Sequence, residues 1–137
     1  MDPHTVADVL EIEALCSTYN RAFDERRAED WAACFTEDGF FERSNAGRSY
    51  QGRTELAALA AGYPVTGRHI TAEHLTDVHG DEATHSCYLV YFDAEKDFAV
   101  DLFGVYSDHL VRVDGKWLFK ERRLVVDERG AGGANGQ

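Results

Sequence analysis

The stretch "FAVDLFGVYSDHLVRVDGKWLFKERRLVVD", residues 98–127, decides the fold of this chain. It holds two long runs rich in β-branched and aromatic residues, separated by the dipeptide Asp-Gly at 114–115. Asp-Gly between two such runs is a strong hairpin signal, because both residues tolerate the positive φ angles of a tight turn between strands. We therefore predict two antiparallel strands here, and the rest of the chain is placed against them.

The residues before this hairpin repeat the pattern. "GRHITAEHLTDV" (67–78) and "ATHSCYLVYF" (83–92) are strand-like, and the turns "HGDE" and "DAEKD" follow them. The second half of the chain is thus predicted to be an antiparallel meander. Residues 98–113 are apolar at both odd and even positions, whereas polar and apolar residues should alternate in a sheet with one face exposed to solvent. We expect one face to pack on helices and the other on a second subunit, with a bend or bulge at Gly104.

The first half of the chain has helical spacing instead. Between residues 5 and 27, apolar side chains recur at steps of three and four, which is typical of an amphipathic helix. "RAEDWAACF" (27–35) is a short helical piece that "TEDG" ends, "GFFERS" (39–44) is a strand, and "RTELAALAAG" (53–62) is a third helix. Helices followed by a sheet in one small domain predict an α+β fold.

The length and composition indicate one globular domain. The chain has 137 residues, of which 44% are hydrophobic and 28% charged, enough to bury one core. We place this domain at residues 1–128. The Gly-rich segment 129–137 offers nothing to bury, and we expect it to be disordered.

The charge and the cysteines exclude several classes of function. A net charge of -11 without a basic stripe argues against a nucleic-acid partner. No apolar stretch reaches the length of a membrane span, and the acidic N-terminus is unlike a secretory signal. Three cysteines without C-x-x-C spacing indicate neither disulfides nor zinc, so we expect a cytoplasmic protein. We expect no metal and no cofactor.

The candidate catalytic groups are acids, bases and hydroxyls. No nucleophile elbow, phosphate loop or dinucleotide fingerprint is present in the sequence. The acid–base candidates are Asp24, His69, His74, His79, His85, Asp101, Asp108 and His109. The hydroxyl donors are Tyr19, Tyr50, Tyr88 and Tyr106.

Asp24 and His69 are the most informative of these. The first helix ends in "STYNRAFDERR" (17–27), so Asp24 lies where the apolar face ends, either as a solvated carboxylate beside Arg27 or as an acid that reaches into a cavity. His69, by itself, is typical of a half-exposed strand residue. Together the two fit a dyad, because an Asp that accepts from one imidazole nitrogen leaves the other as a general base.

The other histidines give weaker signals. An odd offset from His69 turns His74 to the opposite face unless a bulge restores it, and His79 precedes a turn. His85 and His109 share a parity in neighbouring strands, which is compatible with a pocket, a dimer face or a metal pair. A metal site would need a further ligand that the sequence does not supply.

Several segments in this order resemble one known family. "IEALCSTYNRAFDERRAEDWAACFTEDGFFE", "YQG" before a short helix, "GRHIT", "GDEAT" and "GVYSDHLVRVDGKWLFKERRLVVD" together resemble the SnoaL-like proteins of the nuclear transport factor 2-like superfamily. This superfamily includes scytalone dehydratase, ketosteroid isomerase and bile-acid dehydratase. The resemblance covers residues 5–128, and its motifs are specific for the fold and weak for the reaction.

The resemblance implies a cone-shaped curved antiparallel sheet wrapped on N-terminal helices, with one internal pocket and usually a dimer. In the dehydratase branches, an Asp at the end of the first helix pairs with a His that opens the long bent strand, and these roles fall on Asp24 and His69. Tyr19 stands where the bile-acid dehydratase branch has a tyrosine. Scytalone dehydratase has adjacent Tyr and Asp, whereas this chain has Phe23 before its Asp.

The predicted function is a lyase or isomerase of dehydratase or cyclase type, acting without a cofactor on an apolar oxygenated small molecule. Asp24 and His69 are the predicted catalytic residues, and Tyr19, Trp31, Tyr88 and Tyr106 are predicted to contact the substrate. The alternative is a non-catalytic domain that binds a small molecule or mediates association. A homodimer through the outer sheet face is the predicted assembly, with neither nucleic acid nor membrane as a partner.

Overall fold

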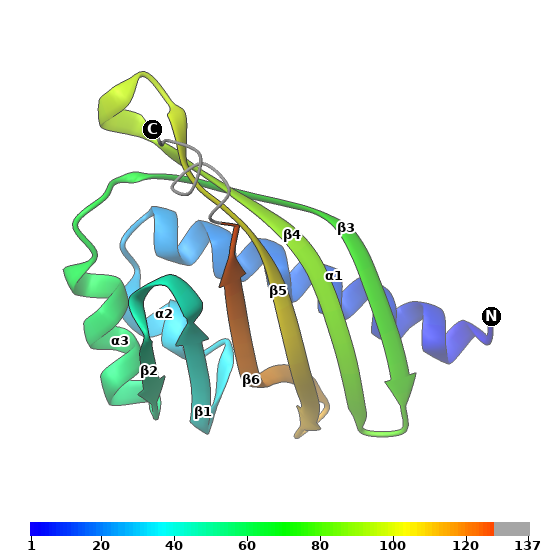
Figure 1. The fold of residues 1–137 in the computed structure, drawn as a ribbon. Helices are drawn as coiled ribbons and strands as arrows, with labels where there is room; N and C mark the ends of the chain where they lie inside the picture. Colours follow the sequence, from blue (N-terminus) through cyan, green and yellow to red (C-terminus); the bar gives the residue numbers. More distant parts are fainter. Residues whose placement is uncertain (128–137) are drawn as a thin grey trace.

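The computed structural model describes residues 1–127, which combine three α-helices with a six-stranded sheet (Figure 1). The helices are α1 (Pro3–Asp24), α2 (Ala28–Ala32) and α3 (Arg53–Gly62). The strands are β1 (Phe35–Arg43), β2 (Arg48–Gln51), β3 (Gly67–His79), β4 (Glu82–Asp93), β5 (Ala99–Val113) and β6 (Lys116–Val126). Short 3-10 turns at Ser44–Ala46 and Ala94–Lys96 join β1 to β2 and β4 to β5. The predicted α+β class is confirmed.

The strands lie in the order β2-β1-β6-β5-β4-β3. The pairs from β3 to β6 are antiparallel hairpin partners, as the turn signals predicted, and β1 joins β6 in parallel. At the turn between β5 and β6, Asp114 has φ 51° and Gly115 has φ 79°. Both positive angles match the right-handed twist of the flanking strands, which is why Asp-Gly predicted this hairpin correctly.

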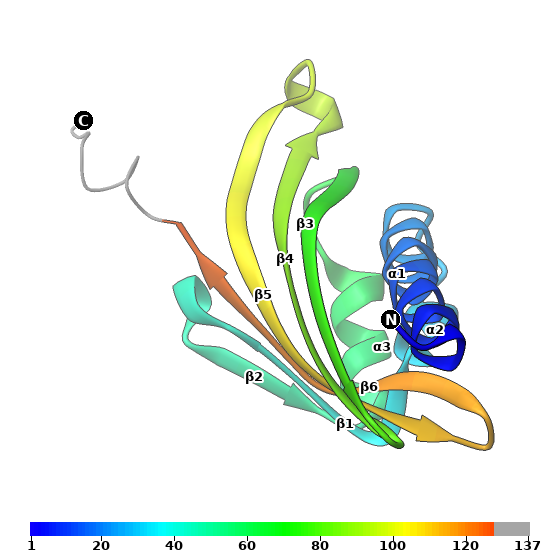
Figure 2. The ribbon, with the colours of Figure 1, turned by 90° about the vertical axis from the view of Figure 1, so that its right-hand side faces the viewer.

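The helices cover one face of the curved sheet, and the other face is left open (Figure 2). The side chain of Asp2 accepts a hydrogen bond from the His4 backbone at 3.2 Å and caps α1, and Pro3 occupies its first turn. The inner face of α1 then buries Ile12 and Tyr19 against the sheet. The core therefore lies between the long helix and the concave side of β3 to β6.

A β-bulge in β3 changes which of its residues face the core. The pairing of β3 with β4 shifts between Ala72 and Leu75, and Glu73 has a φ of 60° inside this bulge. The extra residue reverses the alternation of side chains beyond it. His69 faces inward before the bulge and His74 faces inward after it, although their odd spacing alone places them on opposite faces.

The predicted boundary between the second helix and the first strand was wrong. The strand begins at Phe35, whereas the sequence placed it after "TEDG", at residue 39. Phe35 is fully buried and pairs with Phe119 of β6, and a register shift between Phe35 and Phe40 absorbs the polar residues in between. In residues 1–127, no helix is long and apolar enough to cross a membrane. The predicted disordered tail at 129–137 lies outside the described residues.

Candidate active site

Asp24, the last residue of α1, contacts His69, the third residue of β3. Its Oδ1 lies 2.6 Å from His69 Nδ1, and its Oδ2 accepts a hydrogen bond from the His69 backbone N–H at 2.9 Å. The two side chains are only 7% and 9% exposed. Arg27, the alternative partner considered for Asp24, donates instead to Glu25 and Asp30. The carboxylate at the end of α1 therefore binds the His69 ring and its backbone, and does not point to solvent.

This contact fixes the protonation pattern of the His69 ring. A carboxylate accepts and does not donate, so Nδ1 carries the proton and Nε2 carries the lone pair. Among residues 1–127, Nε2 makes no hydrogen bond, and the ring forms part of the wall of a cavity between the helices and the sheet. The geometry thus leaves Nε2, the ring nitrogen that does not contact Asp24, free to accept a proton.

The surroundings of His69 keep its ring neutral. Burial lowers the pKa of His69 below its ordinary 6.5, because the charged imidazolium loses its hydration. The hydrogen bond to Asp24 acts in the opposite direction, and the positive charges of Arg122 and Arg43 lower the pKa further. A ring that is neutral at pH 7 is ready to accept a proton.

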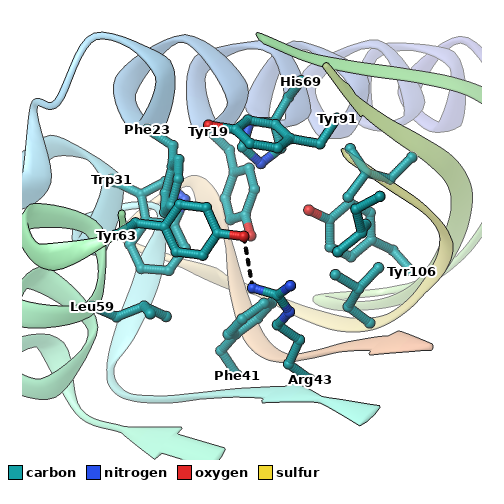
Figure 3. Close-up of a pocket in the computed structure, with 13 residues that line it drawn as sticks. Tyr19, Phe23, Trp31, Phe41, Arg43, Leu59, Tyr63, His69, Tyr91 and Tyr106 are labelled. Carbon is teal, nitrogen blue, oxygen red and sulfur yellow. Dashed lines mark hydrogen bonds between the residues drawn. The ribbon is translucent and has the colours of Figure 1, made fainter. Parts of the chain in front are cut away.

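The cavity beside His69 is narrow and aromatic (Figure 3). The helices contribute Tyr19, Phe23 and Trp31, and the sheet contributes Tyr91 and Tyr106 among others. Its volume is about 40 Å³, room for roughly three waters at about 10–15 Å³ each. The side chains therefore nearly fill the space, and any molecule larger than a few waters would have to displace part of the wall.

Three of the four predicted substrate contacts line this cavity, namely Tyr19, Trp31 and Tyr106. Burial raises the pKa of Tyr19 to about 12, so its hydroxyl keeps its proton and can donate. The fourth predicted substrate contact, Tyr88, lies outside this cavity. It is 50% exposed on the outer face of β4, because its neighbour Leu89 takes the inward position.

Sequence reasoning missed two polar residues of the cavity wall, Arg43 and Tyr63. Arg43 ends β1, and Tyr63 follows α3 directly. Arg43 Nη1 donates to the Tyr63 hydroxyl at 3.0 Å, and Arg43 Nε donates to Asn45 Oδ1 at 2.9 Å. One feature of the sequence pointed to Arg43: it lies two residues after Phe41 on the same strand, so its side chain is on the same face as that buried ring. An arginine at the end of a strand is usually solvated, and the pairing with Tyr63 depends on the position of α3.

A second buried polar cluster lies under the middle of α1. Asp108 Oδ2 lies 2.7 Å from His85 Nδ1, and Asp108 Oδ1 accepts from Arg122 at 3.0 Å. His85 pairs directly with Asp108 in the β4–β5 register, so its comparison with His109 by parity was wrong. His109 points outward and contacts Glu82 at 2.8 Å.

His85 is a poor candidate for a base, unlike His69. Burial opposes its protonation, but the hydrogen bonds to Asp108 and Cys16 outweigh this and raise the pKa of His85 to about 9. Its Nε2 lies 2.9 Å from His74 Nδ1. The ring is therefore charged at neutral pH and has neighbours on both nitrogens, which suits a structural role.

Arg122 lies beneath the cavity because of another bulge. The β5–β6 register shifts between His109 and Leu110, which turns Arg122 inward, where it is 0% exposed. Its guanidinium lies 3.4 Å from the centre of the Tyr106 ring and 4.4 Å from that of Tyr19. A fixed positive charge thus lies under two tyrosines of the cavity. Strand parity gave no sign of it.

Cys16, His74 and His85 are the described residues that could offer ligand atoms to a metal, since one atom of each lies within 4.8 Å of the others. Two nitrogens on one tetrahedral zinc are about 3.3 Å apart, given bonds of about 2.0–2.1 Å. The separation of 2.9 Å between the two rings is instead that of a hydrogen bond. We therefore assign the cluster to the hydrogen-bonded core.

The remaining candidates lie away from the cavity. His79 is exposed and contacts Asp77 at 3.1 Å. Asp101 is exposed on β5. Tyr50 is half-buried and stacks on Phe41 from the neighbouring strand. These residues are not part of the candidate active site.

Comparison with known proteins assigns the chain to a family. The SnoaL-like domain matches residues 4–123. The chain belongs to the SnoaL-like family. This confirms the resemblance seen in the sequence. No curated protein matches this SnoaL-like chain.

Solved structures agree with this assignment. Rv3472 of Mycobacterium tuberculosis, a protein of unknown function, is 36% identical to this SnoaL-like chain, with a TM-score of 0.86 over 93% of this chain and 77% of that one. A nuclear transport factor 2-like protein with a cystatin-like fold from Novosphingobium aromaticivorans is 22% identical, with a TM-score of 0.84 over 96% and 90%. A candidate scytalone dehydratase from the same organism is 23% identical, with a TM-score of 0.80 over 93% and 89%. The last two likenesses establish the fold, which is the nuclear transport factor 2-like fold that the sequence predicted.

Proposed function

We propose that this protein is a lyase or isomerase of dehydratase or cyclase type, in which its own side chains supply the acid–base chemistry. The observation that carries the proposal is the contact between Asp24 and His69, because it leaves the second ring nitrogen of His69 free and this ring lines an aromatic cavity. Family membership supports an isomerase, dehydratase or binding role toward small molecules. The aromatic wall favours an apolar oxygenated substrate.

The chemistry begins with removal of a proton from carbon. His69 Nε2 accepts that proton, and Asp24 stabilises the imidazolium that results, as a carboxylate hydrogen-bonded to Nδ1 does. The hydroxyl of Tyr19 or Tyr106 donates to the carbonyl or leaving oxygen of the substrate. Both tyrosines are protonated, since burial raises the pKa of each above its ordinary value of 10.

Proton abstraction is testable before the substrate is known. Cyclic aryl ketones such as 1-tetralone have exchangeable protons beside the carbonyl, so deuterium uptake from D₂O, followed by NMR, reports a working base. We expect the protein to accelerate this uptake. His69→Ala and Asp24→Asn should each reduce the acceleration by about 10²–10⁴-fold while the circular dichroism spectrum is unchanged.

His79→Ala is the matched control, because His79 is an exposed histidine on the same strand. It should keep full activity. Full deuterium exchange in either His69→Ala or Asp24→Asn would contradict the proposal that the two residues act as a catalytic dyad. A cavity that binds ketones without exchanging their protons would favour the alternative function, a non-catalytic binding domain.

A further inference from the structure

Arg43, Leu59 and Tyr63 form one part of the cavity wall. These three residues line both the cavity and a hollow on the surface between β2 and α3. Figure 3 shows the guanidinium of Arg43 meeting the hydroxyl of Tyr63 across this part of the wall. Since the cavity holds only about 40 Å³, a substrate has to separate side chains to enter. A hydrogen bond of 3.0 Å joins Arg43 and Tyr63 across this wall, and the guanidinium also lies 5.4 Å from the centre of the Tyr63 ring.

Arg43 is a cation without an anionic partner in this wall. The chain has 25 acidic residues, yet within residues 1–127 no carboxylate forms an ion pair with Arg43, whose polar partners are neutral. The other arginine beside the cavity, Arg122, is paired with Asp108 at 3.0 Å. Arg43 is partly buried next to apolar rings. An anion that forms a planar, bidentate pair with such a guanidinium stabilises its charge strongly.

We propose that Arg43 binds a carboxylate of the substrate, and that this carboxylate takes the place of the Tyr63 hydroxyl. This inference rests on the proposed function and names its substrate class, a small apolar carboxylic acid. The aromatic rings enclose the apolar body, His69 stands at the wall for the proton transfer, and Arg43 holds the charged end. Binding and opening are then one event, because the group that pairs with Arg43 also breaks the hydrogen bond that closes the wall.

The position of the charge also affects the base. Arg43 is among the groups that lower the pKa of His69, together with burial and Arg122, while Asp24 raises it. An anion on Arg43 cancels part of the effect of that arginine. Bound carboxylate therefore raises the basicity of His69 in the complex, which couples substrate recognition to proton abstraction.

The test compares benzoate with benzamide, which have the same shape and differ in charge. Calorimetric titration of the full chain gives both affinities, and quenching of tryptophan fluorescence is a second signal, because Trp31 lines the cavity. We expect benzoate to bind at least about tenfold more tightly, as charge-assisted hydrogen bonds imply. Arg43→Gln should abolish this preference. Arg48→Gln, in the surface hollow and outside the cavity, should keep it.

Tyr63→Phe should change the affinity for benzoate in the direction opposite to Arg43→Gln. It keeps the ring and the charge of Arg43 but removes the competing hydroxyl, so benzoate should bind more tightly than to the wild type. His69→Ala separates this inference from the proposed function, because it removes the base and should keep the benzoate preference. Equal affinity for the two probes, binding of neither, or a preference that survives Arg43→Gln would each overturn the assignment.

Discussion

At the scale of single residues, His69 is governed by two opposing neighbours, an apolar cavity and a carboxylate. Burial is the larger influence and holds the pKa of His69 below 6.5, while Asp24 raises it. We expect the His69 ring signal in NMR to titrate below pH 6.5. Asp24→Asn removes the raising contribution, so its midpoint should fall further. The rate of proton abstraction should then be constant near pH 7 and decline only below that midpoint.

The lowered pKa of His69 also makes the free energy of unfolding depend on pH. An unfolded chain binds a proton at His69 at a higher pH than the folded chain does, so stability is lost as the pH falls from 6.5 through the folded pKa. The exposed His79 is the internal reference in the same spectra, and its signal should be unaffected by Asp24→Asn. Titration of His69 above 6.5 would contradict this account, since Asp24 would then outweigh burial.

At the scale of elements, Gly67 places His69. Gly67 opens β3 so close to β4 that a Cβ there would lie 1.8 Å from the carbonyl oxygen of Phe92. Backbone does not yield as a flexible side chain does, so Gly67→Ala should destabilise the fold by about 1–3 kcal/mol in denaturant titrations. It should also displace His69 from Asp24 and lower deuterium exchange.

Gly62→Ala at the end of α3 is the control for this change. Nothing lies within 4 Å of a Cβ at Gly62, and alanine favours helix by up to about 1 kcal/mol over glycine. This variant should be as stable as the wild type or slightly more so. If Gly67→Ala were equally harmless, the close approach of β3 to β4 would not be what positions the base.

The elements also explain how far the sequence could predict this molecule. The hairpins, the long helix and the positions of Asp24 and His69 follow from turn residues and periodicity, which act locally. His74 and Arg122 face the core because β-bulges reverse strand parity, and the sequence does not mark a bulge. The contact of Arg43 with Tyr63 depends on how α3 packs, which is a tertiary property.

At the scale of the whole molecule, the outer face of the sheet is uncovered and exposes several large apolar side chains. The helices cover only the inner face (Figure 2), and the outer face exposes Leu75 (74%), Val125 (57%) and Tyr88 (50%) to solvent. Large apolar side chains exposed on one face of a sheet are typical of an interaction surface. We propose that a second copy of the chain covers it, because the exposed residues come from three strands of one continuous sheet and present a broad, curved surface suited to a like partner.

This assembly predicts a dimer by light scattering at micromolar concentrations. Tyr88→Glu places a charge in the centre of the proposed interface, where an unpaired carboxylate loses its hydration, so the mass should fall to that of a monomer. Leu10→Glu is the control, since Leu10 is an equally exposed apolar residue (62%) on α1, in the other layer. It should leave the dimer intact. The cavity lies entirely on the helix side of the sheet, so the Tyr88 variant should keep deuterium exchange as a monomer. A wild-type chain that is monomeric, or a dimer indifferent to Tyr88→Glu, would exclude this face as the contact.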